Sequence, residues 1–150
     1  MRMRLSEEAA DRIRAHGAEA YPHECCGALL GRDGDEGREV ASIFPLVNRR
    51  DDSPRNRFSL TPDDVRAAEK AAAGRGLELV GWYHSHPDHP ARPSEFDREH
   101  AWPWYSYVIL SVERGEPREM TSWRLADDRA RFEPEEWNVV VGARLQPAPM

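Results

Sequence analysis

Two histidines directly after a strand-like segment are the feature that most constrains how this chain can fold. Residues 77–83 read as a β-strand, and His84 and His86 follow it with one residue between them. Alternate side chains of a strand share one face, so both imidazoles are expected to point the same way. The fold must therefore bring the end of a strand to a place where two imidazoles converge.

A second polar pair follows after a short loop, at Ser94 and Asp97. Residues 93–100 have the pattern of a helix start, where side chains three residues apart are neighbours, so these two share a face. Two imidazoles and one carboxylate suit a zinc ion whose fourth position is left open for water. The histidines alone can also be solvated or core residues, and Ser94 with Asp97 can be a helix cap. Because all these signals occur together, we interpret them as a metal site.

These residues resemble the signature of the JAMM (MPN+) zinc metalloprotease family. The chain has His-Ser-His-Pro at 84–87 and Ser-x-x-Asp at 94–97. The family's first motif places a glutamate at the entrance to an apolar strand, and Glu24 within residues 22–31 matches it. Since no motif position departs from the signature, the metal-free scaffold members of the same fold are a poorer match.

The resemblance covers most of the chain. It includes Asn48 and Phe58 before the middle helix, and residues 108–112 as the strand after the site. It implies an α/β fold of the cytidine-deaminase-like JAB1/MPN type, in which a central mixed β-sheet is flanked by helices. It also implies one catalytic zinc ion.

The chemistry of such a site assigns a role to each residue. Zinc held by His84, His86 and Asp97 lowers the pKa of a bound water towards ~7. We expect Glu24 to accept the proton and deliver it to the leaving amine, although the local sequence alone would favour a surface carboxylate after a proline turn. In the family, the serine that matches Ser94 stabilises the oxyanion, and one such donor is typically worth ~3 kcal/mol.

The resemblance also implies a substrate class. Family members cleave after the C-terminal diglycine of ubiquitin-like β-grasp proteins, whose tail lies in a channel too narrow for side chains. This chain has no long insertion, so it is more similar to the small prokaryotic members. Some of these release cysteine or another residue from a sulfur-carrier protein, and such a carrier is the partner we expect.

Three alternatives stay open. The first is an isopeptidase that removes ubiquitin-like modifiers from proteins. The second is a non-catalytic interaction module of the same fold, and the third is another zinc hydrolase. A nucleoside deaminase needs a Pro-Cys-x-x-Cys pair of ligands, which the sequence lacks. A RadC-like domain usually has Asn at the position of Ser85.

Length and charge agree with one catalytic domain. The 150 residues form a single predicted domain, 1–150, with a loose tail at about 138–150. The net charge is −6 and the basic residues are spread among acidic ones, which argues against a nucleic-acid partner. No apolar run approaches the roughly 20 residues needed to cross a bilayer, so we expect no membrane partner and a cytoplasmic location. A homodimer is left open.

The two cysteines, Cys25 and Cys26, are adjacent. Adjacent cysteines do not form a disulfide framework without strain, so buried thiols in a reducing compartment are expected. A catalytic cysteine activated by a histidine is the alternative.

The remaining pattern predicts helices and strands in alternation, and the tryptophans are expected in the core. Ser6 and Thr61 are expected to cap the two longer helices. The predicted helices span 7–20 and 61–73, and the predicted strands span 26–31, 39–47, 105–113, 119–125 and 130–132.

Overall fold

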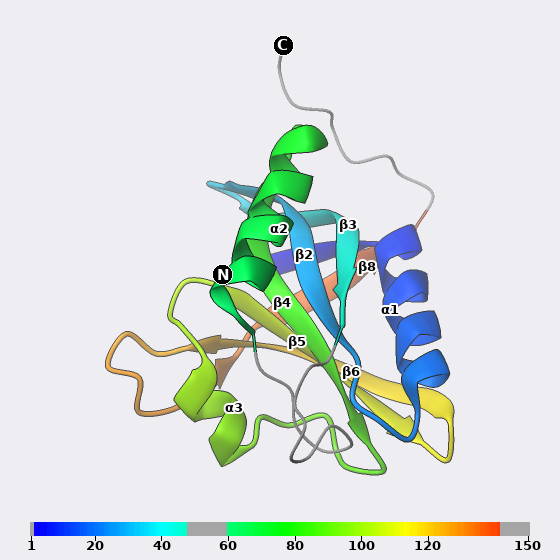
Figure 1. Ribbon diagram of the computed structural model, residues 1–150. Helices are drawn as coiled ribbons and strands as arrows, with labels where there is room; N and C mark the ends of the chain where they lie inside the picture. The colour runs from blue at the N-terminus through cyan, green and yellow to red at the C-terminus, as the bar shows by residue number, and fades with distance from the viewer. Residues whose placement is uncertain (1, 48–59, 142–150) are drawn as a thin grey trace.

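The computed structural model describes residues 2–47 and 60–141, and within them the chain forms one eight-stranded mixed β-sheet (Figure 1). The strands are β1 (Arg2–Ser6), β2 (Cys26–Gly34), β3 (Gly37–Leu46), β4 (Glu78–Pro87), β5 (Ser106–Glu113), β6 (Glu116–Leu125), β7 (Phe132–Pro134) and β8 (Glu136–Val140). Their order across the sheet is β7-β6-β5-β4-β2-β3-β1-β8. The parallel pairs are β4 with β5 and β1 with both β3 and β8.

Three helices accompany the sheet in the described residues: α1 (Glu7–Ala20), α2 (Pro62–Gly74) and α3 (Glu95–His100). The Ser6 hydroxyl accepts a hydrogen bond from the Ala9 N–H at 3.1 Å, and this cap begins α1. Thr61 and Asp64 form a reciprocal capping box at the start of α2. The predicted caps at Ser6 and Thr61 are therefore confirmed.

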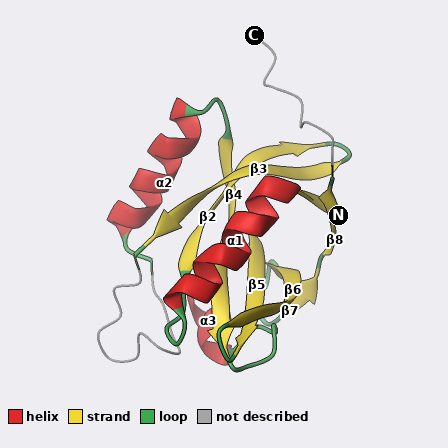
Figure 2. Cartoon of the chain, turned by 90° about the vertical axis from the view of Figure 1, so that its right-hand side faces the viewer, coloured by secondary structure: helices red, strands yellow, loops and turns green. Residues whose placement is uncertain are grey.

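The helices cover both faces of the sheet. The amphipathic α1 lies across one face, as Figure 2 shows, where Ile13 packs among apolar side chains of several strands. Small residues of α2, Ala68 and Ala72, pack on the other face against Leu30 and Trp82. The expected α/β fold, a central mixed sheet flanked by helices, is confirmed.

Strand β4 lies between β2 and β5, so it is hydrogen-bonded on both sides. It continues through Pro87, and His84 and His86 therefore belong to the strand itself instead of following it. His84 is paired with both neighbouring strands, and the pairing with β5 continues through His86 to Pro87, so the backbone at this end of β4 is fixed by the sheet.

The strands β1 and β8 were not predicted from the sequence. They pair with each other in parallel, and Asn138 and Val139 lie opposite Arg4 and Leu5. The predicted tail was placed from about residue 138, whereas β8 runs to Val140. Both strands have only five residues and pair across almost the whole length of the chain, so no local pattern indicates them.

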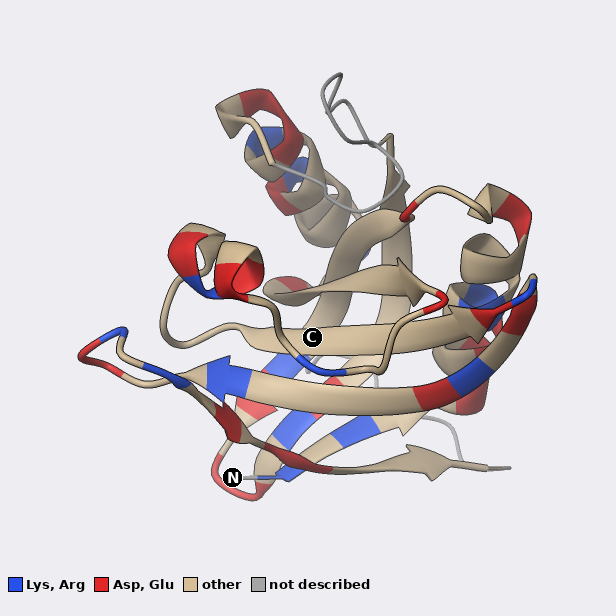
Figure 3. Cartoon of the chain, turned by 90° about the horizontal axis from the view of Figure 1, so that it is seen from below, with Lys and Arg blue, Asp and Glu red and all other residues tan. Residues whose placement is uncertain are grey.

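The surface is mixed in charge. Figure 3 shows Lys and Arg interspersed with Asp and Glu along the strands and helices. Within the described residues, no helix has both the length and the apolar character that a membrane span requires. Asn48 and Phe58, which extended the family resemblance, lie outside the described residues.

Candidate functional site

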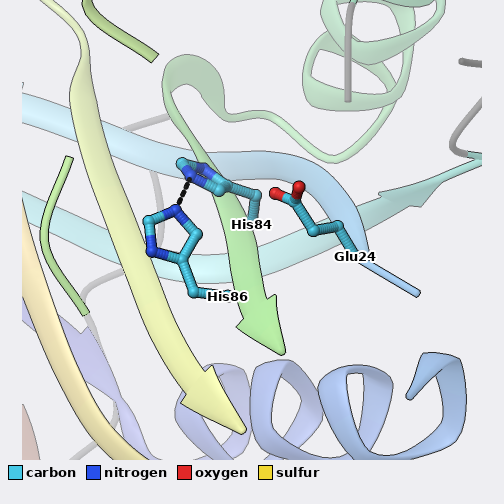
Figure 4. Close-up of side chains that lie close together, drawn as sticks. All are labelled: Glu24, His84 and His86. Carbon is cyan, nitrogen blue, oxygen red and sulfur yellow. Dashed lines mark hydrogen bonds between the residues drawn. The ribbon is translucent and has the colours of Figure 1, made fainter. Parts of the chain in front are cut away.

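The pairing of β2 with β4 brings Glu24 to the histidines. Cys26 lies opposite His84 in this antiparallel pair, and the Ser85 N–H donates to the Cys25 carbonyl at 3.1 Å. The Cys25 N–H in turn donates to the Ser85 hydroxyl at 2.8 Å. Continuing this register by two residues beyond the Cys26–His84 pair sets Glu24 opposite His86, on the face that both histidines share. Figure 4 shows the Glu24 carboxylate directed toward His84, with the His86 ring beyond it.

Three donor atoms form a nearly equilateral triangle at the end of β4. His84 Nε2 and His86 Nε2 are 3.1 Å apart, and Asp97 Oδ2 is 3.2 Å from each of them. Tetrahedral zinc with bonds of about 2.0–2.1 Å separates its ligands by roughly 3.3 Å. The three donors therefore have the spacing of ligands to one metal ion.

The hydrogen bond on the other side of the His86 ring determines its tautomer. His86 Nδ1 lies 2.9 Å from the Pro90 carbonyl oxygen, which can only accept, so Nδ1 carries the proton. In the neutral ring, Nε2 then presents a lone pair to the Asp97 carboxylate oxygen, which is also an acceptor. Two acceptors at this distance need a proton or a cation between them. The tautomer is the one that metal ligation requires.

Burial and charge set the protonation of the other two groups. Burial lowers the pKa of His84, while the neighbouring Asp97 carboxylate opposes that change. Burial by itself would raise the pKa of Asp97, but its interactions with His84 and His86 lower it overall. A neutral imidazole and an ionised carboxylate are the forms that bind a metal.

Asp97 is also part of a helix cap. Its N–H donates to the Ser94 hydroxyl at 3.0 Å, and its Oδ2 accepts from the Ser94 N–H at 2.9 Å. This capping box begins α3, as the alternative interpretation of these two residues predicted. The cap and the metal site do not exclude each other, because the oxygen that accepts in the cap is the one that faces the histidines. The Ser94 hydroxyl accepts in the cap and can still donate its own proton.

Glu24 lies close to this triangle but less tightly. Its carboxylate is buried, and the residue is only 2% exposed. One oxygen of this carboxylate and one ring nitrogen of each histidine all lie within 4.8 Å of one another. Glu24 also faces a cleft of about 320 Å³, whose other lining residues are His86, Pro87, His89, Pro90, Arg92 and Ser94. In this position the Glu24 carboxylate can act either as a metal ligand or as a base that takes a proton from a water in the cleft.

A narrower apolar pocket also borders the triangle. Its volume is about 30 Å³, and His84 and Asp97 form its polar end. Leu60 lines this pocket and also a groove of about 710 Å³ that contains Trp82 and Trp102. The expectation that the tryptophans lie in the core is wrong for Trp102 and Trp104, which are 46% and 47% exposed.

Asp88 was missed by the sequence analysis. Its carboxylate accepts from the Tyr21 hydroxyl at 2.6 Å and from the Arg114 N–H at 2.8 Å. The backbone N–H of Asp88 donates to the Val112 carbonyl at 2.7 Å. Asp88 thus joins the turn before Glu24 to the loop after His86. The sequence signal was only a carboxylate directly after the His-Ser-His-Pro motif.

The cysteines are free and buried, as predicted. Burial raises the pKa of the Cys25 thiol to about 11, so it is protonated at neutral pH. A protonated, inaccessible thiol is a poor nucleophile, and this argues against the catalytic-cysteine alternative.

Comparisons with known proteins agree with this geometry. Residues 6–126 match the family described as prokaryotic homologs of the JAB domain. The desampylase of Haloferax volcanii is 38% identical over 115 residues, covering 73% of this chain and 81% of that protein. A probable TtuB-protein conjugate cleaving protease of Thermus thermophilus is 36% identical over 103 residues, covering 69% and 66%. The solution structure of a Salinibacter ruber protein has 46% identity and a TM-score of 0.75, covering 97% and 96%.

Proposed function

The chain belongs to the prokaryotic JAB family of JAMM (MPN+) metallopeptidases, and from this membership we propose that it is a zinc-dependent enzyme that cleaves after the C-terminal diglycine of a ubiquitin-like β-grasp protein. The observation that carries the proposal is the triangle of His84, His86 and Asp97, with donor atoms 3.1–3.2 Å apart. Two imidazoles and one carboxylate at such a spacing suit zinc.

Different residues of the site are assigned metal binding, proton transfer and stabilisation of the oxyanion. His84, His86 and Asp97 would hold zinc, which when bound supplies a Lewis acid that makes water more acidic. Glu24, shielded from bulk solvent beside the histidines, accepts a proton in the cleft and returns it to the leaving amine. The Ser94 hydroxyl, at the edge of the same cleft, donates to the oxygen that develops negative charge.

The space around the triangle supports glycine next to the cut bond. The pocket beside His84 and Asp97, at about 30 Å³, has room for roughly two waters but not for a large side chain. The wider cleft beside Glu24 is left for the group that departs. A diglycine tail that approaches from the groove at Leu60 satisfies both conditions.

The partner we propose is a sulfur-carrier protein from which cysteine or another residue is released. The match of residues 6–126 to the prokaryotic homologs of the JAB domain supports this choice. The name of the Thermus thermophilus relative, which refers to cleavage of a TtuB-protein conjugate, supports the isopeptidase alternative. We propose a cytoplasmic location, which two free thiols support.

The test is mass spectrometry of a β-grasp carrier that ends in Gly-Gly-Cys after incubation with the zinc-loaded protein. Loss of the terminal cysteine is expected, and a chelator should abolish it. A carrier joined through its diglycine to a lysine side chain is tested in parallel and distinguishes the isopeptidase alternative. If neither substrate is cleaved by protein that contains stoichiometric zinc, the proposed function is wrong. Protein that binds no zinc would favour the non-catalytic module.

A further inference from the structure

Arg92 is a cationic side chain in the cleft that the proposed mechanism does not use. It lines the cleft together with Glu24, His86 and Ser94, and it is exposed. Within residues 2–47 and 60–141, its guanidinium takes part in no hydrogen bond or ion pair. By contrast, Arg98 on the neighbouring helix α3 is paired with Glu95. The guanidinium of Arg92 is therefore available to a ligand in the cleft.

The loop that carries Arg92 is held rigidly. Three successive carbonyl groups, those of residues 89–91, accept hydrogen bonds from other parts of the fold. The His89 carbonyl accepts from the Ser111 hydroxyl at 2.7 Å, and the Ala91 carbonyl accepts from the Thr121 hydroxyl at 2.6 Å. Pro90 lies between them and Pro93 follows Arg92, so the backbone has little freedom.

The same loop is bonded to the metal site. The Pro90 carbonyl accepts a hydrogen bond from His86 Nδ1 at 2.9 Å and another from the Arg92 N–H at 2.9 Å. One carbonyl group thus fixes both the ring of a metal ligand and the backbone of Arg92. The base of the Arg92 side chain is consequently fixed relative to the reacting centre, which reduces the entropy lost when it binds a ligand.

The charges in the cleft indicate what that ligand carries. Glu24 is the carboxylate among the lining residues, and it would repel a second carboxylate brought into the cleft. Arg92 is always protonated and offers two parallel N–H donors that match a carboxylate. A volume of about 320 Å³ is at the small end for ligand pockets and is suited to one amino acid.

The chemistry of the proposed cleavage supplies such a group. When the bond after a diglycine joins a single C-terminal amino acid, the nitrogen that leaves is attached to the carbon that bears a free α-carboxylate. When the bond joins a lysine side chain, the leaving nitrogen is attached to a methylene group and no carboxylate lies beside it. A cation at the side of the cleft can bind the first leaving group through its carboxylate but not the second, so it distinguishes the two.

We propose that Arg92 forms a subsite for the α-carboxylate of the amino acid that is released, and that it makes the enzyme prefer a carrier with a free C-terminal residue. This inference depends on the proposed function, since it assigns the leaving side of the same site. Arg92 determines specificity here and takes no part in proton transfer.

The experiment compares two forms of one carrier, which end in Gly-Gly-Cys either as the free acid or as the carboxamide. The zinc-loaded wild-type protein is expected to cleave the acid with a kcat/KM about tenfold higher, mainly through a lower KM, as for a charge-assisted hydrogen bond. Arg92→Gln should lose this preference by slowing only the acid, and Arg92→Lys should keep part of it. Arg118→Gln, which removes an exposed cation on β6 outside the cleft, is the matched control and should keep the preference.

The outcomes separate the two proposals. If the wild-type protein cleaves both forms equally, or if Arg92→Gln slows both to the same extent, the carboxylate subsite is wrong and the proposed function stands. If the wild-type protein cleaves neither form, nor a lysine-linked conjugate, the proposed function is wrong and the subsite falls with it. Zinc content and thermal melting of each variant exclude misfolding as the cause.

Discussion

The two ends of strand β4 carry buried polar clusters of opposite character. Near its beginning, Arg38 is fully buried and Nη1 of its guanidinium donates to the carbonyls of Val80 and Trp104 and to the Ser106 hydroxyl. Its Nε donates to Asp33. At the end of β4, by contrast, the Nε2 atoms of two imidazoles face one carboxylate oxygen, and that of His86 presents a lone pair to it. Donors predominate in the first cluster, where Arg38 Nη2 has no hydrogen-bond partner among the described residues, whereas the second gathers nitrogen and oxygen atoms of the kind that ligate metals. A buried group of such atoms is complementary to a cation that the chain itself does not provide.

The largest effect is expected from Asp97→Ala, which removes one of the three donors. Zinc binding should be lost, and hydrolysis should fall by more than about a thousandfold, because Lewis-acid polarisation is worth several kcal/mol. Metal analysis and the carrier assay measure both changes. Loss of the helix cap should cost about 1 kcal/mol of stability in addition. Asp97→Asn keeps an oxygen for the cap and is the matched control for the loss of stability. An Asp97→Ala protein with stoichiometric zinc would contradict the ligand assignment.

Glu24→Gln tests whether the carboxylate in the cleft is a base or a ligand. We expect hydrolysis to fall by about 10²–10⁴-fold, because the amide cannot accept a proton, while the zinc content stays at that of the wild type. Retained activity would remove the assignment of the base. Loss of zinc together with activity would instead make Glu24 a ligand.

Arg38→Met tests the other cluster. It leaves Asp33 and several buried acceptors without their cation, so the free energy of unfolding should fall by about 3–5 kcal/mol. Urea unfolding measures this change. The fraction that remains folded should bind zinc normally. Wild-type stability combined with loss of zinc would show that the two clusters are not independent.

Tyr21→Phe should have the smallest effect. It removes the 2.6 Å hydrogen bond from the hydroxyl to Asp88, which costs about 1 kcal/mol. The turn before Glu24 then loses one of its links to the histidine loop, and we expect kcat to fall by less than about tenfold with unchanged zinc content. Asp88→Asn keeps the shape of the acceptor and should be milder than Asp88→Ala. Unchanged kcat in both Tyr21→Phe and Asp88→Ala would show that this link does not position Glu24.

The features of the site that depend on a single strand or helix could be predicted from the sequence. The alternation of His84 and His86 and the spacing of Ser94 and Asp97 depend only on the geometry of one strand and one helix start. The position of Glu24 needed more, because it follows from the register between β2 and β4, whose paired residues are about 60 positions apart in the chain. The family resemblance supplied what the local pattern lacked.

Other features could not be predicted because they arise from long-range packing. Arg38 is an ordinary charged residue in its local sequence, and its burial depends on carbonyl groups of β4 and of the loop before β5. Trp104 has a positive φ of 83° and lies over the Arg38 guanidinium, which holds it at the surface although its hydrophobicity indicates a core residue. No short-range pattern reveals such a pair.

The double use of Asp97 Oδ2 limits how this site can be re-engineered. One oxygen both caps α3 and faces the two histidines, so the start of the helix and the position of the proposed third ligand cannot be altered separately. An insertion or deletion between Ser94 and Asp97 would shift both at once. Loop-length variants between Pro87 and Pro93 would leave the start of the helix in place, but they would break the hydrogen bonds of residues 88–91 that fix the His86 ring and the backbone of Arg92.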